Sequence, residues 1–443
     1  MNKWLILYYL GGLYLKPIRS RKHLDNVMCR RLRRFENFLL RESPFYSALL
    51  QKFHHVLSLP VINKADYLAN FNTINTVGVN YDIAMQVALR AEVSRDFTPM
   101  LGDISVGLSS GTSGNRGLFL TSSKERARWV AAIIHRVIGW SWRPRKVAFF
   151  LRANNNLYES ARSRLLDFNF FDLSQAFEKL MTALNTLNPD ILIGQPSVLL
   201  EIAKRQKSGD VSISPTKVIS VAEVLEEDTK KELQSVFNQK IHQVYQCTEG
   251  FLAYTCREGN LHLNEDFIYV EPQFLEDDKI RFFPVITDML RRTQPIVRYA
   301  LNDILTLDAL PCGCGSPFRV ISSIEGREDD TLVFTKRGGE SVLVFGDFIR
   351  KIFLLADSAN QLINYQVIQN QVDKISIIFD HQPNVNIIQL QEQIYDGWTK
   401  FAVDHQLILP EIEFKTDIQF DPMIKFRRII RNPFTLPIKT KYL

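Results

Sequence analysis

"ILIGQPSVLLEIAKR", residues 191–205, runs from an apolar segment through a short turn into a helical pattern. "TKVISVAEVLEEDTKKEL", residues 216–233, repeats the same order of strand, turn and helix. The run "KVAFFL", residues 146–151, is typical of a buried strand, and a helical pattern precedes it over 124–140. Strands that alternate with helices in this way indicate an α/β domain with a largely parallel sheet.

The C-terminal part of the chain shows a different pattern of predicted elements. After about residue 326 the chain breaks into short strands and helices, "LINYQVIQNQVDKISIIFD" (362–380) and then "NIIQLQEQIYDGWTKFAVDHQ" (386–406). Such a mixture suits a small α+β module. We therefore predict an α/β protein with a large multi-sheet N-terminal domain over residues 1–326 and a small mobile α+β domain over residues 327–443.

Composition limits the classes of protein that this chain can be. Its 443 residues are 46% hydrophobic and 23% charged, which is typical of a globular protein. The formal net charge of +6 is modest, and no basic repeat with interleaved aromatic residues is present, so we expect no nucleic-acid partner. Between residues 16 and 34 eight basic residues face one acid, Asp25. They are Lys16, Arg19, Arg21, Lys22, Arg30, Arg31, Arg33 and Arg34.

An apolar stretch, "WLILYYLGGLYL" (residues 4–15), precedes this basic patch. It has only about half of the roughly 20 residues that a membrane-spanning helix needs. It is also a poor signal peptide, because cationic residues follow where a cleavage site of small residues should be. We therefore expect a cytoplasmic protein. Two interpretations of the stretch stay open: a first helix docked on the domain surface, or an interfacial anchor beside anionic lipid headgroups.

Small residues crowd the stretch "LSSGTSGNRGLFL", residues 108–120. Glycines permit turns with positive φ, and bare backbone N–H groups can wrap an anion closely. The alternative is a flexible surface loop. The candidate anion-binding residues are Ser109, Ser110, Gly111, Thr112, Ser113, Gly114, Arg116 and Gly117.

Three further motifs follow downstream. In "HQVYQCTEGFLAYTC" (242–256), Tyr245 can stack on a ring, while Thr248 and Glu249 pair a hydroxyl with a carboxylate suited to phosphate and Mg²⁺. In "QPIVRYALNDIL" (294–305), Asp303 stands at the end of an apolar strand, where a carboxylate can accept both ribose hydroxyls. "IEGREDD" (324–330) then places Arg327 beside a glycine and two acids.

The order of these motifs resembles that of the adenylate-forming superfamily. The stretches "SPFY" (43–46), "LP-x-I-x-K" (59–64) and "GQPS" (194–197) make the chain most similar to the phenylacetate–coenzyme A ligase branch. Within that branch it looks closest to the clade related to the archaeal synthetase that adenylylates a deazaflavin cofactor. The resemblance covers nearly the whole chain.

The resemblance implies a role for each matching position. The loop from Ser109 to Gly117 would hold the β- and γ-phosphates of ATP, and Arg116 stands where many members carry a lysine. Arginine keeps the positive charge but grips phosphate as a planar fork. The remaining positions are Ala222 and Glu223 beside the adenine, Tyr245 and Thr248 against the nucleotide, Glu249 on Mg²⁺, Asp303 on the ribose, Arg327 beside it, and Lys425 as the lysine used in adenylation.

The cysteines give a separate indication. Cys256 and His262 lie close together in the sequence, and Cys312 and Cys314 form a Cys-x-Cys pair. Three thiolates and one imidazole make a closed tetrahedral set for structural zinc, and similar sets occur in the branch that the chain resembles. The alternative is four reduced cysteines without metal, since a disulfide is disfavoured in the cytoplasm.

The implied activity is attack of a small carboxylic acid on the α-phosphate of MgATP, which gives an acyl-adenylate and pyrophosphate. The acyl group would then pass to a thiol of coenzyme A or of an acyl carrier protein, with the small domain rotating about residues 329–330. The alternatives are an adenylyltransferase that leaves AMP on a hydroxyl of a cofactor-like target, a ligase that forms an amide or ester, a non-catalytic scaffold, and a membrane-surface assembly protein.

Overall fold

The structure is a computed structural model. It describes residues 3–94, 99–108, 117–151, 165–275, 279–327, 331–357, 361–416, 418, 426–432 and 440–442. The chain forms two compact units. The first unit comprises residues 1–273, 282–301 and 306–323, and the second comprises residues 274–281, 302–305 and 324–443. The three ranges of the second unit include two short stretches, 274–281 and 302–305, that come before the boundary expected after residue 326. Each unit is described by itself below.

Helices form the start of the first unit, and local sequence signals set their ends. Ser20 caps the second helix, and Ser43 both ends that helix and caps the next, which begins at Pro44. The chain breaks between these two helices at Ser43–Pro44, because proline suits the first turn of a helix. The elements are α1 (Lys3–Leu15), α2 (Arg21–Glu42), α3 (Pro44–Phe53), η1 (Val56–Ser58), α4 (Lys64–Ala69), α5 (Phe71–Ile74) and α6 (Tyr81–Ser94).

A small antiparallel sheet and a long helix follow. The sheet has the order β1-β2-β3, and α6 packs against it through an apolar cluster that includes Ala84, Ala88 and Val106. The next helix begins with a capping box between Ser122 and Glu125 and ends in a π-helical turn. These elements are β1 (Met100–Leu101), β2 (Ile104–Leu108), β3 (Leu118–Thr121), α7 (Ser123–Ile133) and η2 (Ile134–Ile138).

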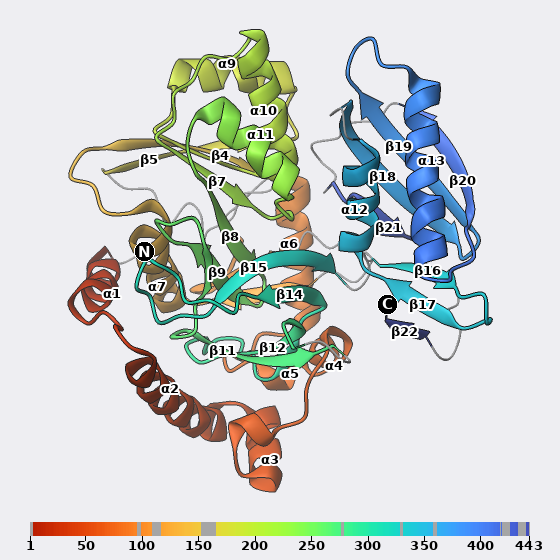
Figure 1. Ribbon diagram of the computed structural model, residues 1–443. Coiled ribbons are helices and arrows are strands. Elements are labelled where there is room, and N and C mark those ends of the chain that lie inside the picture. The colour runs from red at the N-terminus through yellow and green to blue at the C-terminus, as the bar shows by residue number, and fades with distance from the viewer. Residues whose placement is uncertain are drawn as a thin grey trace. The chain divides into compact units, whose positions relative to one another are not determined.

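The largest sheet has twelve strands among the described residues, in the order β11-β12-β14-β15-β10-β9-β8-β7-β6-β4-β5, with β13 paired to β12 (Figure 1). Strands β5, β4, β6, β7 and β8 are mutually parallel, whereas β8 and β9 are antiparallel. The strands are β4 (Arg145–Leu151), β5 (Leu166–Asp172), β6 (Ile191–Gly194), β7 (Lys217–Val221), β8 (Ile241–Cys247), β9 (Gly250–Thr255), β10 (Leu261–Leu263), β11 (Ile268–Phe274), β12 (Arg281–Asp288), β13 (Tyr299–Ala300), β14 (Asp303–Leu307) and β15 (Val320–Arg327).

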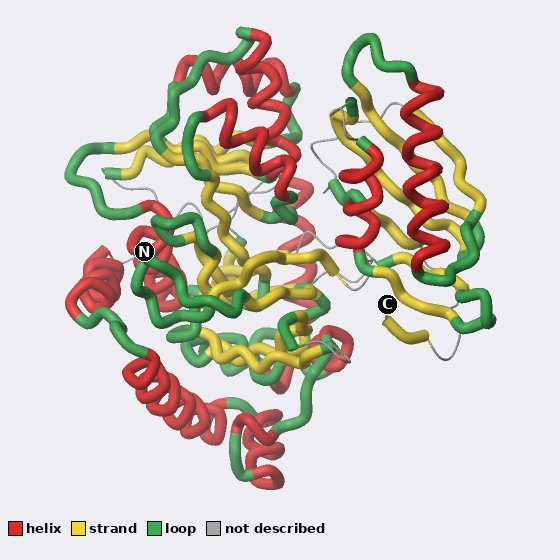
Figure 2. The backbone as a smooth tube through the Cα atoms, in the orientation of Figure 1, coloured by secondary structure: helices red, strands yellow, loops and turns green. Residues whose placement is uncertain are grey.

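Helices α9 (Phe177–Leu187), α10 (Pro196–Ser208) and α11 (Glu227–Phe237) lie together against the parallel part of this sheet (Figure 2). Their apolar residues form one core cluster with strand residues such as Phe150, Leu192 and Val218, all of which are fully buried. The alternation of strands and helices predicted over residues 191–233 is confirmed by β6, α10, β7 and α11.

The second unit is an α+β module, as predicted. A four-stranded sheet of order β20-β19-β18-β21 and a three-stranded sheet of order β16-β17-β22 share a core around the buried Trp398 and Phe353. The elements are β16 (Leu332–Thr335), β17 (Ser341–Val344), α12 (Gly346–Ala356), β18 (Leu362–Gln371), β19 (Lys374–His381), α13 (Ile387–Asp404), β20 (Glu411–Thr416), β21 (Ile429–Arg431) and β22 (Thr440–Tyr442).

Within the described ranges, none of the helices has the length and apolar character required to cross a membrane.

Candidate active site

Several of the predicted site residues follow the carboxyl ends of neighbouring parallel strands. Ala222 and Glu223 come directly after β7, and Thr248 and Glu249 come directly after β8. The carboxyl edge of an open parallel sheet is where such folds bind ligands. Ala222 takes a left-handed conformation with φ of 68°, which turns the chain sharply at this edge. Glu223 accepts a hydrogen bond of 2.8 Å from the Ser197 hydroxyl, at the start of α10.

Thr248 and Glu249 form the tip of the tight β8–β9 hairpin, where Cys247 pairs with Gly250. The Thr248 hydroxyl donates a hydrogen bond of 2.8 Å to a Glu249 carboxylate oxygen. Tyr299 also hydrogen-bonds to Glu249, and burial together with this carboxylate raises the pKa of the Tyr299 phenol. A Cβ on Gly250 would stand 2.8 Å from Ile268 Cδ1, so a larger residue there requires the Ile268 side chain to shift. The tight turn and the hydrogen bonds from Thr248 and Tyr299 hold Glu249 at the tip of the hairpin.

A small cavity opens beside this hairpin, within the first unit. The empty space in it, open solvent included, is about 280 Å³. It brings the predicted residues Gly117, Thr248 and Glu249 together, and Gly117 is the last residue of the predicted anion-binding loop. The other lining residues are Lys64, Tyr67, Leu68, Leu118, Arg291, Gln294, Ile296 and Tyr299.

Lys64 reaches this cavity because the "LP-x-I-x-K" stretch docks beside β13. Ile62 exchanges backbone hydrogen bonds with Arg298 and Ala300, and the Tyr67 hydroxyl donates to the carbonyl of Pro295 at 3.0 Å. This stretch carries part of the resemblance to the phenylacetate–coenzyme A ligase branch. The structure gives it a second role, because it places a lysine and a tyrosine on the cavity wall.

Two buried polar residues that sequence reasoning missed join the Glu249 hairpin to the strand after the glycine loop. Gln294 accepts a hydrogen bond from the Leu120 N–H at 2.8 Å and donates one to the Leu118 carbonyl at 3.0 Å. It therefore bonds to two backbone groups of β3. Arg291 donates to Gln294 at 2.8 Å and also to the carbonyl of Thr248. The signal for this network was the polar run "DMLRRTQP" (288–295) between two apolar segments.

Gln294→Leu is expected to destabilise the first unit. The change leaves the Leu120 N–H, the Leu118 carbonyl and one Arg291 N–H buried without a partner, which costs on the order of 3 kcal/mol in unfolding free energy. The midpoint of thermal unfolding should fall by roughly 6–10 °C. Gln51→Leu, an exposed glutamine on α3, is the matched control and should leave the midpoint unchanged. Equal midpoints for both variants would show that this hydrogen-bond network does not contribute to the free energy of unfolding.

The expected position of one nucleotide residue needs correction. Asp303 was expected at the end of an apolar strand, but it is the first residue of β14. The reason is that β13 pairs with β12 only through Tyr299 and Ala300, after which the chain leaves the ladder. Tyr245 lies within β8 with 9% of its surface exposed, and its contact with a nucleotide stays a prediction.

The remaining predicted residues divide by whether the structure describes them. Arg327 is the last residue of β15, and Asp303 is the first residue of β14. Both residues belong to the second unit. The loop residues Ser109, Ser110, Gly111, Thr112, Ser113, Gly114 and Arg116 lie outside the described residues, and so does Lys425.

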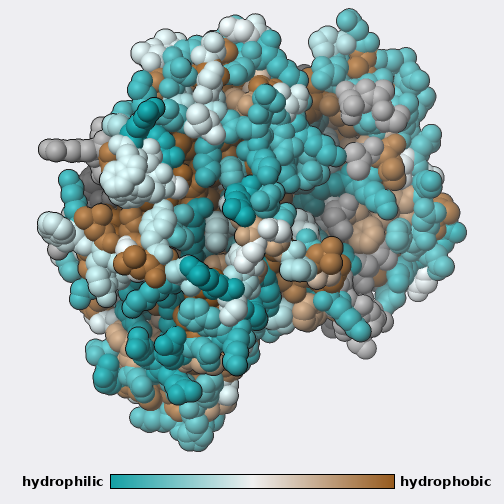
Figure 3. Space-filling model, turned by 60° about the vertical axis from the view of Figure 1, so that its left-hand side comes forward, coloured by the Kyte–Doolittle hydropathy of each residue, from teal (hydrophilic) through white to brown (hydrophobic). Residues whose placement is uncertain are grey.

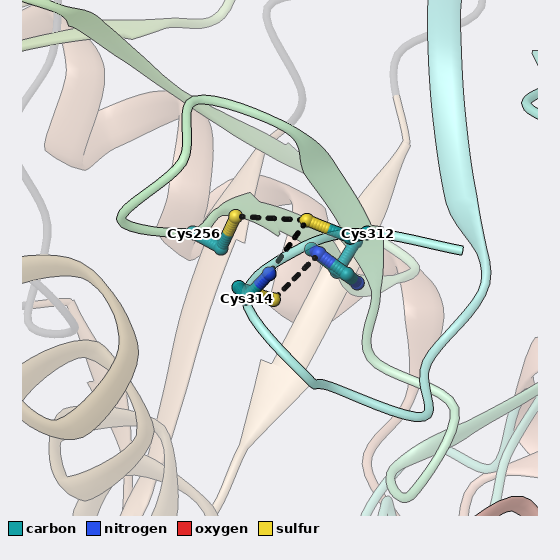
Figure 4. Close-up of side chains that lie close together, drawn as sticks. Cys256, Cys312 and Cys314 are labelled. Carbon is teal, nitrogen blue, oxygen red and sulfur yellow. Dashed lines mark hydrogen bonds between the residues drawn. The ribbon is translucent and has the colours of Figure 1, made fainter. Parts of the chain in front are cut away.

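The predicted cysteine and histidine set does come together. The ligand atoms of Cys256, His262, Cys312 and Cys314 all lie within 4.8 Å of one another. The three cysteines point toward one another from the end of β9 and from the loop after β14 (Figure 4). Cys256 Sγ is 3.7 Å from Cys312 Sγ, and Cys314 Sγ is 3.4 Å from His262 Nε2. Tetrahedral zinc with bonds of 2.0–2.3 Å requires separations of about 3.6–3.8 Å between such atoms.

Surrounding groups orient this cluster. His262 is fully buried, and its Nδ1 lies 3.0 Å from the carbonyl of Phe318, so the Nδ1–H tautomer leaves Nε2 directed at the sulfurs. Asn260 donates to Cys312 Sγ at 3.2 Å. Burial raises the pKa of the Cys312 thiol, but hydrogen bonds led by those from the Cys314 backbone and Asn260 outweigh it and lower that pKa to about 6. The donor set therefore fits a four-coordinate zinc ion.

This large sheet with the Thr248–Glu249 hairpin at its carboxyl edge, together with the α+β unit, is the fold of the adenylate-forming ligases. A structure of 2-hydroxyisobutyryl-CoA ligase in the postadenylation state, in complex with 2-HIB-AMP, matches it with a TM-score of 0.71 at 15% identity, covering 94% of this chain and 90% of that chain. A structure of the anthranilate CoA ligase AuaEII in complex with anthranoyl-AMP has a TM-score of 0.50 at 15% identity, covering 72% and 65%. The resemblance to the superfamily is confirmed at the level of the fold.

The similarities in sequence to known proteins are low. Protein CapK of Staphylococcus aureus is 22% identical over 392 residues, which cover 82% of this chain and 80% of that protein. Indoleacetate–lysine synthetase of Pseudomonas savastanoi is 27% identical over 143 residues, which cover 31% and 34%. No family model matches the chain. The assignment to the phenylacetate–coenzyme A ligase branch stays a prediction.

Proposed function

We propose that this protein is an ATP-dependent ligase that activates a carboxylic acid as an acyl-adenylate and then passes the acyl group to a thiol. The observation that carries the proposal is the meeting of Gly117, Thr248 and Glu249 at one cavity, on the ligand-binding edge of a sheet with the fold of adenylate-forming ligases. The substrate class is a small-molecule carboxylic acid, with MgATP as co-substrate. A cytoplasmic location stays a prediction.

Glu249 supplies the charge that this reaction needs at the cavity. Its carboxylate would bind the Mg²⁺ that arrives with ATP, since carboxylate oxygen is a preferred ligand of that ion. The Thr248 hydroxyl, which already points at Glu249, would turn toward the α-phosphate. The chain itself mainly positions the reactants and neutralises charge as pyrophosphate leaves.

The other nucleotide contacts in the proposal rest on the resemblance. The loop from Ser109 to Gly117 would hold the β- and γ-phosphates. Ala222 and Glu223 would line the adenine, and the carboxylate of Asp303 would accept the ribose hydroxyls with Arg327 beside it. Lys425 would bridge the attacking carboxylate and the α-phosphate oxygens. For Glu223 the proposal is supported by its place at the carboxyl end of β7, next to β8.

The acceptor is proposed to be the thiol of coenzyme A or of an acyl carrier protein. Two of the solved structures that share the fold belong to coenzyme A ligases, which supports a thiol. Indoleacetate–lysine synthetase is by its name a ligase that joins an acid to an amine, so an amine is the second candidate acceptor.

The test is a pyrophosphate-release assay with a panel of aryl, fatty, hydroxy and amino acids, each with and without coenzyme A. We expect release that depends on one class of acid, with AMP and a thioester as products when coenzyme A is present. AMP attached to a hydroxyl of a cofactor-like target would instead identify an adenylyltransferase. An amide formed with lysine would support the amine acceptor, and no release with any acid would contradict the proposal.

We further propose that Cys256, His262, Cys312 and Cys314 hold a structural zinc ion. The support is the fit of the four ligand atoms and the orientation of His262 by Phe318. A zinc ion bound there would cross-link the end of β9 and the loop that follows β14 through its coordination bonds. Because β9 begins at Gly250, this cross-link would stiffen the hairpin that carries Glu249.

The purified protein is expected to contain about one zinc ion per chain, as one closed four-ligand site requires. Cys314→Ser should lose the zinc and lower the midpoint of thermal unfolding, because metal binding contributes folding free energy. Cys29→Ser, at an exposed cysteine on α2, is the matched control and should keep both. Atomic emission spectroscopy measures the metal. A wild-type protein prepared without chelator and free of zinc would contradict the site.

A further inference from the structure

Helix α1 presents an apolar face to solvent. Its inner side packs on α7 and η2, where Leu10 is buried and Tyr14 makes an edge-on contact with His135 at 4.5 Å. The outer side has the spacing of one helical face, yet it carries large apolar and aromatic side chains. The exposed fractions are 79% for Trp4, 50% for Leu7, 73% for Tyr8 and 83% for Leu15, and Tyr14, at the edge between the two sides, is 45% exposed. A face of this kind on a folded domain marks a binding surface.

The turn after η2 extends this face. Trp140 and Trp142 stack edge to face at 5.3 Å and are 41% and 83% exposed. The turn follows η2 directly, and α1 packs against η2, where the Tyr14 ring contacts His135. Figure 3 turns this side of the molecule forward and shows brown apolar residues gathered among paler ones. We call the exposed residues of α1 with Trp140 and Trp142 the aromatic face.

The surroundings of the aromatic face are basic. Residues 3–24 and 139–146 contain no acid, and they place Lys16, Arg19, Lys22 and Arg143 in exposed positions around it. Two other residues of the basic patch have structural partners instead: Arg21 pairs with the buried Glu265 at 2.8 Å, and Arg31 with Asp266 at 3.7 Å. These ion pairs fix α2, which carries Lys22 and begins six residues after the end of α1.

We propose that the aromatic face docks this protein on a membrane surface that carries anionic lipids. Trp and Tyr are the residues that settle at the boundary between headgroups and hydrocarbon, and neighbouring Lys and Arg are attracted by the negative surface potential. A helix that lies in the membrane plane buries one apolar face in this way. A second copy of the chain is a poorer occupant, because a two-fold contact through this face would bring the basic residues of both copies together. The proposal does not depend on the ligase activity.

Vesicle co-sedimentation of the full chain tests this proposal. The protein should bind vesicles of phosphatidylcholine and phosphatidylglycerol in equal parts at least tenfold more strongly than vesicles of phosphatidylcholine alone. The triple variant Trp4→Ser, Tyr8→Ser and Leu15→Ser should bind the mixed vesicles roughly tenfold or more weakly, since it removes the apolar area that would be buried. Its thermal midpoint should be unchanged, because all three residues are exposed. Ile388→Ser with Val403→Ser, exposed apolar residues of α13, is the matched control and should bind like the wild type.

Two results would overturn the proposal. One is a wild-type protein that stays in the supernatant with both kinds of vesicle. The other is a triple variant that binds as the wild type does. Light scattering that finds a dimer for the wild type and a monomer for the triple variant, with no lipid binding by either, would assign the aromatic face to self-association instead.

Discussion

Glu249→Gln is expected to reduce acid-dependent ATP–pyrophosphate exchange by on the order of 10²–10³-fold. The amide keeps the shape of the side chain but removes the negative charge that would bind the Mg²⁺ of ATP. Glu249 supplies the carboxylate of the hairpin tip, between the paired residues Cys247 and Gly250. The measurement is the exchange of labelled pyrophosphate into ATP, with the acid that releases most pyrophosphate.

The matched control for this variant is Glu227→Gln, at an exposed glutamate on α11. It should exchange at the wild-type rate, and both variants should keep the wild-type thermal midpoint. Unchanged exchange in Glu249→Gln would mean that the Thr248–Glu249 motif has been misread.

Lys425→Ala is expected to separate the two half-reactions. If the ammonium neutralises charge between the carboxylate and the α-phosphate, its loss slows adenylate formation by on the order of 10²–10³-fold. Thioester formation from a chemically prepared acyl-adenylate should continue, because no pyrophosphate leaves in that step. Both rates can be measured with the same variant, the first by pyrophosphate exchange and the second by release of AMP in the presence of coenzyme A.

Lys415→Ala, an exposed lysine on β20, serves as the control and should leave both rates unchanged. If both half-reactions of Lys425→Ala fall together, the lysine is structural. If neither falls, the catalytic cation lies elsewhere. Arg427 is then tested before Arg428, since the Arg428 guanidinium lies over the Tyr365 ring at 4.8 Å.

Local patterns predicted the parts of the fold that local physics determines. The parallel strands and their helices were predictable over residues 191–233 because apolar runs, turns and helical periodicity alternate there. The break at Ser43–Pro44 was predictable because a cap and a proline stand together. The cluster of three cysteines and one histidine was predictable from the ligand chemistry of these residue types, although strands β10 to β14 lie between Cys256 and Cys312.

Features that depend on contacts between distant residues were not predictable. The sequence shows a basic patch, but only the fold shows that Arg21 reaches Glu265 and that Arg31 reaches Asp266, both more than 200 positions away. The link from β3 through Gln294 and Arg291 to the Thr248 carbonyl also joins three distant segments. Neither arrangement has a local periodicity that would reveal it.

The transfer of oxygen from the acid to AMP tests the central claim most directly. In the proposed reaction a carboxylate oxygen attacks the α-phosphate and stays on phosphorus when the thiol later breaks the acyl–oxygen bond. The acid that releases most pyrophosphate is therefore supplied with both carboxylate oxygens labelled as ¹⁸O, together with ATP and coenzyme A, and the products are analysed by mass spectrometry. The account predicts one ¹⁸O atom in each AMP released, whereas label in inorganic phosphate, with ADP as the nucleotide product, would contradict it.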